Sequence, residues 1–184
     1  SKRERAYFDE DGHSVQRSLL KTPMRFFRIS SGFSSRRKHP ILGFTKAHNG
    51  VDYAAPTGTP VWSVGKGRVS YAGWKGPNGK LVRIDHAQGY QTAYAHLSKI
   101  HPKVKRGATV EAKQIIGYVG TTGRSTGPHL HFAIKKNGVF MNPQKIKRPR
   151  GHSIEAANLA TFKDRVKALK ARLFLEAKTT GETP

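Results

Sequence analysis

Short alternating runs of apolar and polar residues fill the middle of the chain. They occupy residues 61–64, 68–72, 81–84, 90–95, 115–119 and 129–135. Turn-forming residues separate them, as in Gly76-Pro77-Asn78-Gly79 and Asn137-Gly138, where glycine supplies backbone conformations that other residues avoid. Many short strands with no helical period between them predict an all-β, antiparallel domain.

A different period begins beyond residue 150. Apolar residues recur there at helical spacing, at Leu159, Phe162, Val166, Leu169 and Leu173, which predicts a C-terminal amphipathic helix. We therefore expect three parts: residues 1–24 as an N-terminal arm or the remnant of a preceding domain, residues 25–143 as the β domain, and residues 144–184 as a basic linker with the helix. A weak echo between residues 58–73 and 107–120 favours a duplicated β unit.

The charge of the chain limits its partners without choosing one. The 34 Lys and Arg against 11 Asp and Glu give a formal net charge of +23, which favours an anionic partner. Nucleic acid, membrane headgroups and cell-wall polymers all meet that description. The sequence contains no helix-turn-helix, zinc-finger or RNP-type motif, so no nucleic-acid partner is expected.

Other absences exclude further classes. The chain has no cysteine, which removes disulfide scaffolds, thiolate metal sites and cysteine nucleophiles. No run approaches the ~18 apolar residues of a transmembrane helix, so no transmembrane segment is expected. The N-terminus has neither an initiator Met nor the apolar region of a signal peptide, so we expect a piece of a longer protein whose signal or anchor lies outside it.

The candidate chemistry lies in two histidine-containing segments. His48 and Asp52 are four residues apart in a stretch where Gly50 argues against a helix, and in an extended segment both side chains share one face. Strand alternation over 129–135 places Leu130 toward the core and His129 and His131 on the opposite face. From these residues alone, both segments are either metal or catalytic sites or merely polar surface.

A third segment contains His96. Alternation predicts Thr92, Tyr94 and His96 on one strand face and Ala93, Ala95 and Leu97 on the other. Considered alone, His96 has the features of a structural residue. His86, beside the turn at Gly89, is interpreted in the same way.

Together the three segments are specific. The ordered motifs H-x3-D, Y-A-H-L and S-T-G-P-H-L-H resemble the lysostaphin-type (LytM-like) zinc metallopeptidases. The similarity extends over about residues 25–143, and Arg28-Ile29-Ser30-Ser31 is most similar to the Gram-negative periplasmic branch of peptidoglycan endopeptidases.

The resemblance implies a site and a fold. It implies one Zn²⁺ per chain, held by His48, Asp52 and His131, with His96 and His129 as catalytic histidines. It implies a barrel-sandwich-like (duplicated hybrid) antiparallel β core with an open groove. Two imidazoles and one carboxylate leave a zinc position open for water, and no glutamate lies beside them, so histidine must perform the acid–base work.

The resemblance also implies a function. The expected activity is hydrolysis of peptide cross-links in bacterial peptidoglycan, at D-alanyl–meso-diaminopimelate bonds (D,D-endopeptidase), in the periplasm or cell envelope. The expected partners are peptidoglycan stem peptides, the anionic cell wall, and a regulatory segment or partner that covers the groove. Two alternatives stay open: a catalytically silent wall-binding or amidase-activating module, which the complete ligand set opposes, and a glycyl-glycine endopeptidase.

Overall fold

The computed structural model describes every residue except 1–5, 16–17, 26, 39–44, 148 and 181–184. Its elements are β1 Arg28–Ser31, β2 Ser34–Lys38, β3 Thr45–His48, β4 Val51–Ala54, β5 Pro60–Trp62, β6 Gly67–Trp74, η1 Gly76–Asn78, β7 Lys80–Asp85, η2 Ala87–Gly89, β8 Tyr90–Leu97, β9 Lys99–Ile100, β10 Thr109–Val110, β11 Ile115–Tyr118, β12 His129–Lys136, β13 Val139–Met141 and α1 Ala156–Thr180. The predicted strands and the predicted helix are confirmed, and so is the mostly antiparallel β fold class.

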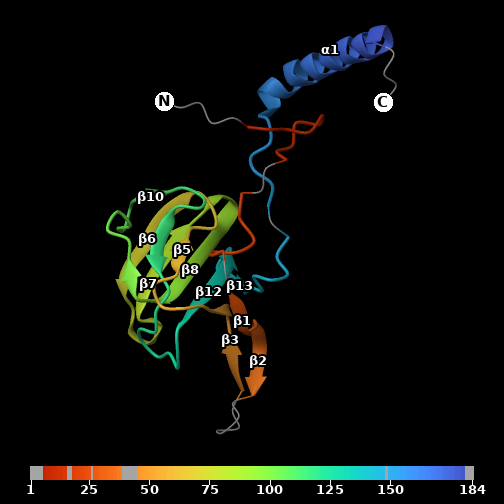
Figure 1. Cartoon of the computed structure of the whole chain (residues 1–184). Coiled ribbons are helices and arrows are strands. Elements are labelled where there is room, and N and C mark those ends of the chain that lie inside the picture. The colour runs from red at the N-terminus through yellow and green to blue at the C-terminus, as the bar shows by residue number, and fades with distance from the viewer. Residues whose placement is uncertain (1–5, 16–17, 26, 39–44, 148, 181–184) are drawn as a thin grey trace. The chain divides into compact units, whose positions relative to one another are not determined.

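The largest sheet carries the functional face. Its strands follow the order β1-β4-β12-β8-β7-β6-β10. Strand β13 also pairs with β12, at residues 134–136, whereas β4 pairs with residues 129–132 of β12. The strands curve around one another in the green and teal part of Figure 1 without closing into a barrel. Strands β5, β11 and β9 form a second sheet, and β2 and β3 form a two-stranded sheet.

Strand β12 shows why this sequence folds as a sheet. Leu130, Phe132 and Ile134 are almost fully buried, whereas His129 and His131 lie on the opposite face, as the alternation predicted. Burying each large apolar side chain stabilises the fold by roughly 1.5–3 kcal/mol. A shift of register by one residue would place the histidines in the core, so burial fixes which face carries the chemistry.

The predicted echo corresponds to a crosswise pairing. β5 pairs with β11, and β6, which follows β5, pairs with β10, which precedes β11. Two copies of one β unit related by a two-fold axis pair in this way. The topology therefore supports the interpretation of a duplicated unit.

The chain divides into two compact units, Leu19–Arg148 and the pair of segments Ser1–Ser18 and Pro149–Pro184. In the second unit, the N-terminal arm packs on α1: the Phe8 and Phe162 rings meet edge to face with centroids 6.1 Å apart, and Lys170 pairs with Glu10. The domain boundaries expected after residues 24 and 143 remain predictions. Among the described helices, none has the length and apolar character needed to cross a membrane.

Candidate metal centre

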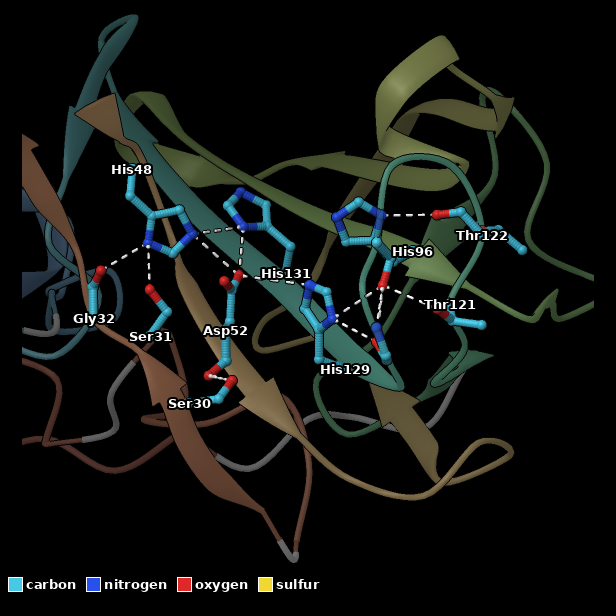
Figure 2. A network of polar contacts seen from close by, with 12 residues as sticks. Ser30, Ser31, Gly32, His48, Asp52, His96, Thr121, Thr122, His129 and His131 are labelled. Carbon is cyan, nitrogen blue, oxygen red and sulfur yellow. Dashed lines mark hydrogen bonds and ion pairs between the residues drawn. The ribbon is translucent and has the colours of Figure 1, made fainter. Parts of the chain in front are cut away.

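Three potential ligand atoms converge at one end of the sheet. His131 Nδ1 lies 2.8 Å from Asp52 Oδ1, and His48 Nε2 lies 3.1 Å from the same oxygen and 3.2 Å from His131 Nδ1. All three atoms are within 4.8 Å of one another. Figure 2 shows the carboxylate of Asp52 between the two rings. The structure thus brings together the three residues expected as ligands.

The backbone route to this cluster differs from the expected one. We expected His48 and Asp52 on one face of a continuous extended segment, but β3 ends at His48, the chain bends at Asn49–Gly50, and Asp52 belongs to β4 in another sheet. Asp52 is then paired directly with His131 across β4 and β12. The convergence was predicted correctly, whereas its cause is a bend combined with strand register.

Gly50 is required at the bend because the His131 ring occupies the space where a side chain would begin. A Cβ on Gly50 would lie 2.6 Å from His131 Cε1 and 2.7 Å from both His131 Nε2 and the Phe132 carbonyl oxygen. These separations are shorter than van der Waals contact allows. The glycine lets the backbone approach the His131 ring closely.

The orientation of His48 is set by a backbone carbonyl. Its Nδ1 lies 2.7 Å from the Gly32 oxygen, which can only accept, so Nδ1 carries the proton and Nε2 presents its lone pair to Asp52 and His131. The Ser31 hydroxyl lies 3.4 Å from the same Nδ1. Partners of this kind fix the tautomer of histidines that bind metals.

His96 and His129 flank the cluster and share the same tautomer. His129 Nδ1–H donates to the Gly127 oxygen and His96 Nδ1–H donates to the Thr122 oxygen, each at 2.8 Å. The two ring centroids are 4.8 Å apart, and His129 Nε2 lies 3.9 Å from Asp52 Oδ1. Each ring therefore has an Nε2 that can accept a proton, beside the three potential ligands (Figure 2).

The backbone at His96 corrects the predicted face assignment. We expected Tyr94 and His96 on one face and Ala95 and Leu97 on the other, but Tyr94 and Leu97 are both fully buried in the core, and Ala95 and His96 both line the groove. The cause is a φ of 61° at His96, a left-handed conformation that non-glycine residues adopt rarely. It interrupts the alternation and turns the imidazole toward His129.

Burial and hydrogen bonding set the charge states at the site. Burial would raise the pKa of Asp52, but hydrogen bonds to the His131 and His48 rings outweigh it and hold that pKa well below its ordinary value. Burial is the main cause that lowers the pKa of His96, and its bond to Thr122 offsets part of this effect. Asp52 is therefore an anion and His96 a neutral imidazole at neutral pH.

The chemistry of these donors fits a divalent metal. Two imidazole nitrogens and one carboxylate oxygen are ligands that zinc prefers, and three protein ligands leave a position open. The side chains of His48, Asp52 and His131 retain 14%, 16% and 21% of their exposure, so a metal there would be partly buried and would still be reached from the groove.

The cluster opens into a groove of about 920 Å³. Small side chains, Ala93, Ala95 and Ala133, line it beside the histidines, and Arg83 and Lys135 line it farther along the strands. These two cations were not among the site residues predicted from the sequence. The alternation in β12 places Lys135 on the face of His129 and His131, so its position in the groove could have been predicted from the sequence. The position of Arg83 depends on the pairing register of β7 and β8, which the sequence does not reveal.

The groove of this antiparallel β domain has the composition of a metallopeptidase site: a cluster of two histidines and one aspartate, with two further histidines beside it. The model of peptidase family M23 matches residues 46–143. The chain belongs to peptidase family M23, which confirms the resemblance seen in its motifs.

Curated relatives and solved structures agree with this assignment. The chain is 42% identical over 156 residues to peptidoglycan DD-endopeptidase ShyC of Vibrio cholerae, covering 85% of this chain and 36% of that protein. It is 43% identical over 169 residues to DD-carboxypeptidase/endopeptidase Mpg of Neisseria meningitidis, covering 90% and 38%. A zinc-containing peptidase from Vibrio cholerae superposes with a TM-score of 0.69 at 38% identity, covering 78% of this chain and 47% of that one. The chain spans little more than a third of the length of the two curated relatives.

Proposed function

We propose that this chain is the catalytic part of a zinc-dependent peptidoglycan endopeptidase that hydrolyses D-alanyl–meso-diaminopimelate cross-links. The observation that carries the proposal is the convergence of His48, Asp52 and His131 in one groove with His96 and His129. Backbone carbonyls orient the His48, His96 and His129 rings so that each presents Nε2 toward the site. The names of the relatives, which include DD-endopeptidases, support the choice of bond.

In this proposal His48, Asp52 and His131 hold one zinc ion. When bound, zinc supplies the Lewis acidity that makes water acidic enough to attack at neutral pH and that polarises a carbonyl. Asp52 contributes the negative charge of the ligand set, and its lowered pKa keeps it ionised well into the acid range.

His129 and His96 carry the proton in this mechanism. His129 Nε2 lies 3.9 Å from Asp52 Oδ1. It accepts the proton of the attacking water because Nδ1–H of the same ring donates to the Gly127 oxygen. The water oxygen bonds to the carbonyl carbon, the C–N bond breaks, and the proton held by imidazole passes to the leaving amine. His96 stays neutral through burial and provides a second acceptor beside His129.

The setting of the enzyme follows from the substrate and the charge. Peptidoglycan lies in the cell envelope, so we place the chain in the periplasm or associated with the envelope. A charge of +23 favours adhesion to the carboxylates of the wall. A segment or partner that covers the groove would control access to it.

Digestion of purified cross-linked muropeptides, followed by mass spectrometry, tests the proposal. We expect dimers to become monomers by cleavage of the D-alanyl–diaminopimelate bond, cleavage to stop with a chelator, and zinc to restore it. Full activity of the metal-free protein would refute the zinc mechanism. Zinc binding without any cleavage would favour the silent wall-binding module, and cleavage of pentaglycine bridges alone would favour a glycyl-glycine endopeptidase.

A further inference from the structure

The floor of the groove is organised in rows across the strands. Asp52, His131 and Ala95 form one row, because Asp52 pairs with His131 and His131 pairs with Ala95. Ala133, Ala93 and Arg83 form the next row on the same face. Two residues along a strand span about 7 Å, so the Arg83 row lies about two residues of an extended peptide away from the candidate metal ligands, within reach of the long arginine side chain.

Lys135 continues the same face of β12. It lies two residues beyond Ala133 and pairs with Gln91, and both residues line the groove with Arg83. The residues between these cations and the metal ligands include Ala93, Ala95 and Ala133. Because alanine side chains are short, an extended peptide can lie over this stretch of the floor with its own side groups directed at Arg83 and Lys135.

Both cations rest on aromatic rings rather than on carboxylates. The Arg83 guanidinium lies 5.8 Å from the centroid of the Tyr71 ring, and Lys135 Nζ lies 4.3 Å from that of Phe140. Such contacts position a cation without neutralising it. Within the described part of the chain, neither cation forms an ion pair with a carboxylate.

The nearest carboxylate on the same strand is already engaged. Asp85 Oδ1 accepts hydrogen bonds from Gln91 Nε2 at 2.6 Å and from Ser70 Oγ at 3.1 Å. These hydrogen bonds hold the Asp85 carboxylate against Gln91 and Ser70. Arg83 and Lys135 thus remain two half-buried positive charges that face a substrate groove.

We infer that Arg83, assisted by Lys135, binds the free carboxylate of the diaminopimelate residue whose amino group forms the scissile amide. This inference rests on the proposed function. In that cross-link the carboxylate is attached to the same carbon as the scissile nitrogen, whereas a glycine bridge has no carboxylate there. The subsite therefore selects an acidic residue on the amine side of the bond, and it favours diaminopimelate cross-links over glycine bridges.

Paired substrates test the subsite. One is a cross-linked muropeptide dimer with the free diaminopimelate carboxylate, and the other is the same dimer with that carboxylate converted to a carboxamide. For the zinc-loaded chain we expect kcat/KM to be at least ~10-fold higher on the free acid, as for loss of a hydrogen bond to a charged group. In Arg83→Gln, kcat/KM on the free acid should fall to its value on the carboxamide, and kcat/KM on the carboxamide should stay the same. Arg83→Lys should restore part of the preference for the acid.

Controls separate the subsite from general effects of charge. Lys135→Gln should reduce the preference less than Arg83→Gln. Arg106→Gln removes an exposed positive charge outside the groove and should leave both rates unchanged. Zinc content and the thermal unfolding midpoint of each variant show whether the site and the fold are intact.

The outcomes also separate the subsite from the proposed activity. Equal kcat/KM on acid and amide by the wild-type chain, with both cleaved, would overturn the subsite and leave the endopeptidase intact. If neither dimer is cleaved, the proposed hydrolysis is refuted, and calorimetry of the binding of each dimer tests the subsite alone. Tighter binding of the acid than of the amide, lost in Arg83→Gln, would support the subsite. Equal binding with no cleavage would overturn both.

Discussion

Replacing Gly50 with alanine tests whether the backbone beside His131 positions this proposed metal ligand. The new Cβ would lie 2.7 Å from the Phe132 carbonyl oxygen and 2.6–2.7 Å from two atoms of the His131 ring. The carbonyl belongs to the central strand β12 and cannot move away, but the ring can rotate. We therefore expect His131 to move, and metal affinity to fall more than overall stability.

The size of each effect can be worked out from these contacts. Overpacking a filled site costs about 1–3 kcal/mol of stability, and disturbing the support of a metal ligand costs about 10–100-fold in affinity. Competition with a fluorescent zinc chelator measures the affinity, and thermal unfolding of the metal-free protein measures the stability. Gly127→Ala is the matched control for zinc affinity, because a Cβ there meets nothing within 4 Å. Zinc affinity of Gly50→Ala within twofold of the wild-type value would refute the reasoning.

The remaining predictions concern the site histidines, the net charge and the partly buried His86. His131→Ala should lose both zinc and activity, whereas His129→Ala and His96→Ala should keep zinc and lose at least ~10²-fold in rate; elemental analysis beside initial rates checks this, and a folded but metal-free His129→Ala protein would reverse the assigned roles. Raising salt should weaken binding to intact sacculi more than hydrolysis of a small soluble peptide, because exposed charges are screened beyond ~8 Å at physiological salt; equal sensitivity of both would exclude adhesion through charge. Burial lowers the pKa of His86 below 6.5. The unfolded chain therefore binds a proton at this residue more readily than the folded chain does, and the free energy of unfolding decreases as pH falls below ~6.5. Urea unfolding of His86→Gln at pH 7 and 5.5 should show a smaller loss on acidification than wild type, and an equal loss would exclude His86 as a cause.

Local patterns in the sequence predicted those features that depend on one segment alone. The alternation in β12 placed Leu130 in the core and His131 on the open face, and burial confirms it. The apolar spacing of the C-terminal segment predicted α1. In both cases the period of the side chains predicted the element. In β12 one face is buried, whereas in α1 Leu169 and Leu173 of the apolar stripe are exposed.

Features that depend on pairing between segments were beyond the same reasoning. The left-handed φ of His96 has no signal in its side chain, since a β-strand period predicts the opposite face. The pairing of Asp52 with His131, and of Arg83 with Ala93, is set by registers that no single strand specifies. The proposed ligand set was therefore predicted through the resemblance, whereas the cationic end of the groove was found only in the structure.

The division of the proposed ligands between two sheets has a thermodynamic consequence. His48 closes the two-stranded β2–β3 sheet, whereas Asp52 and His131 belong to the eight-stranded sheet, with only the bend at Asn49–Gly50 between His48 and β4. An ion that binds all three would cross-link the small sheet to the large one. Part of the free energy of metal binding is then free energy of ordering β2–β3, so amide hydrogen exchange in these strands should slow when the metal binds. Metal binding and the ordering of the β2–β3 sheet would thus be thermodynamically coupled.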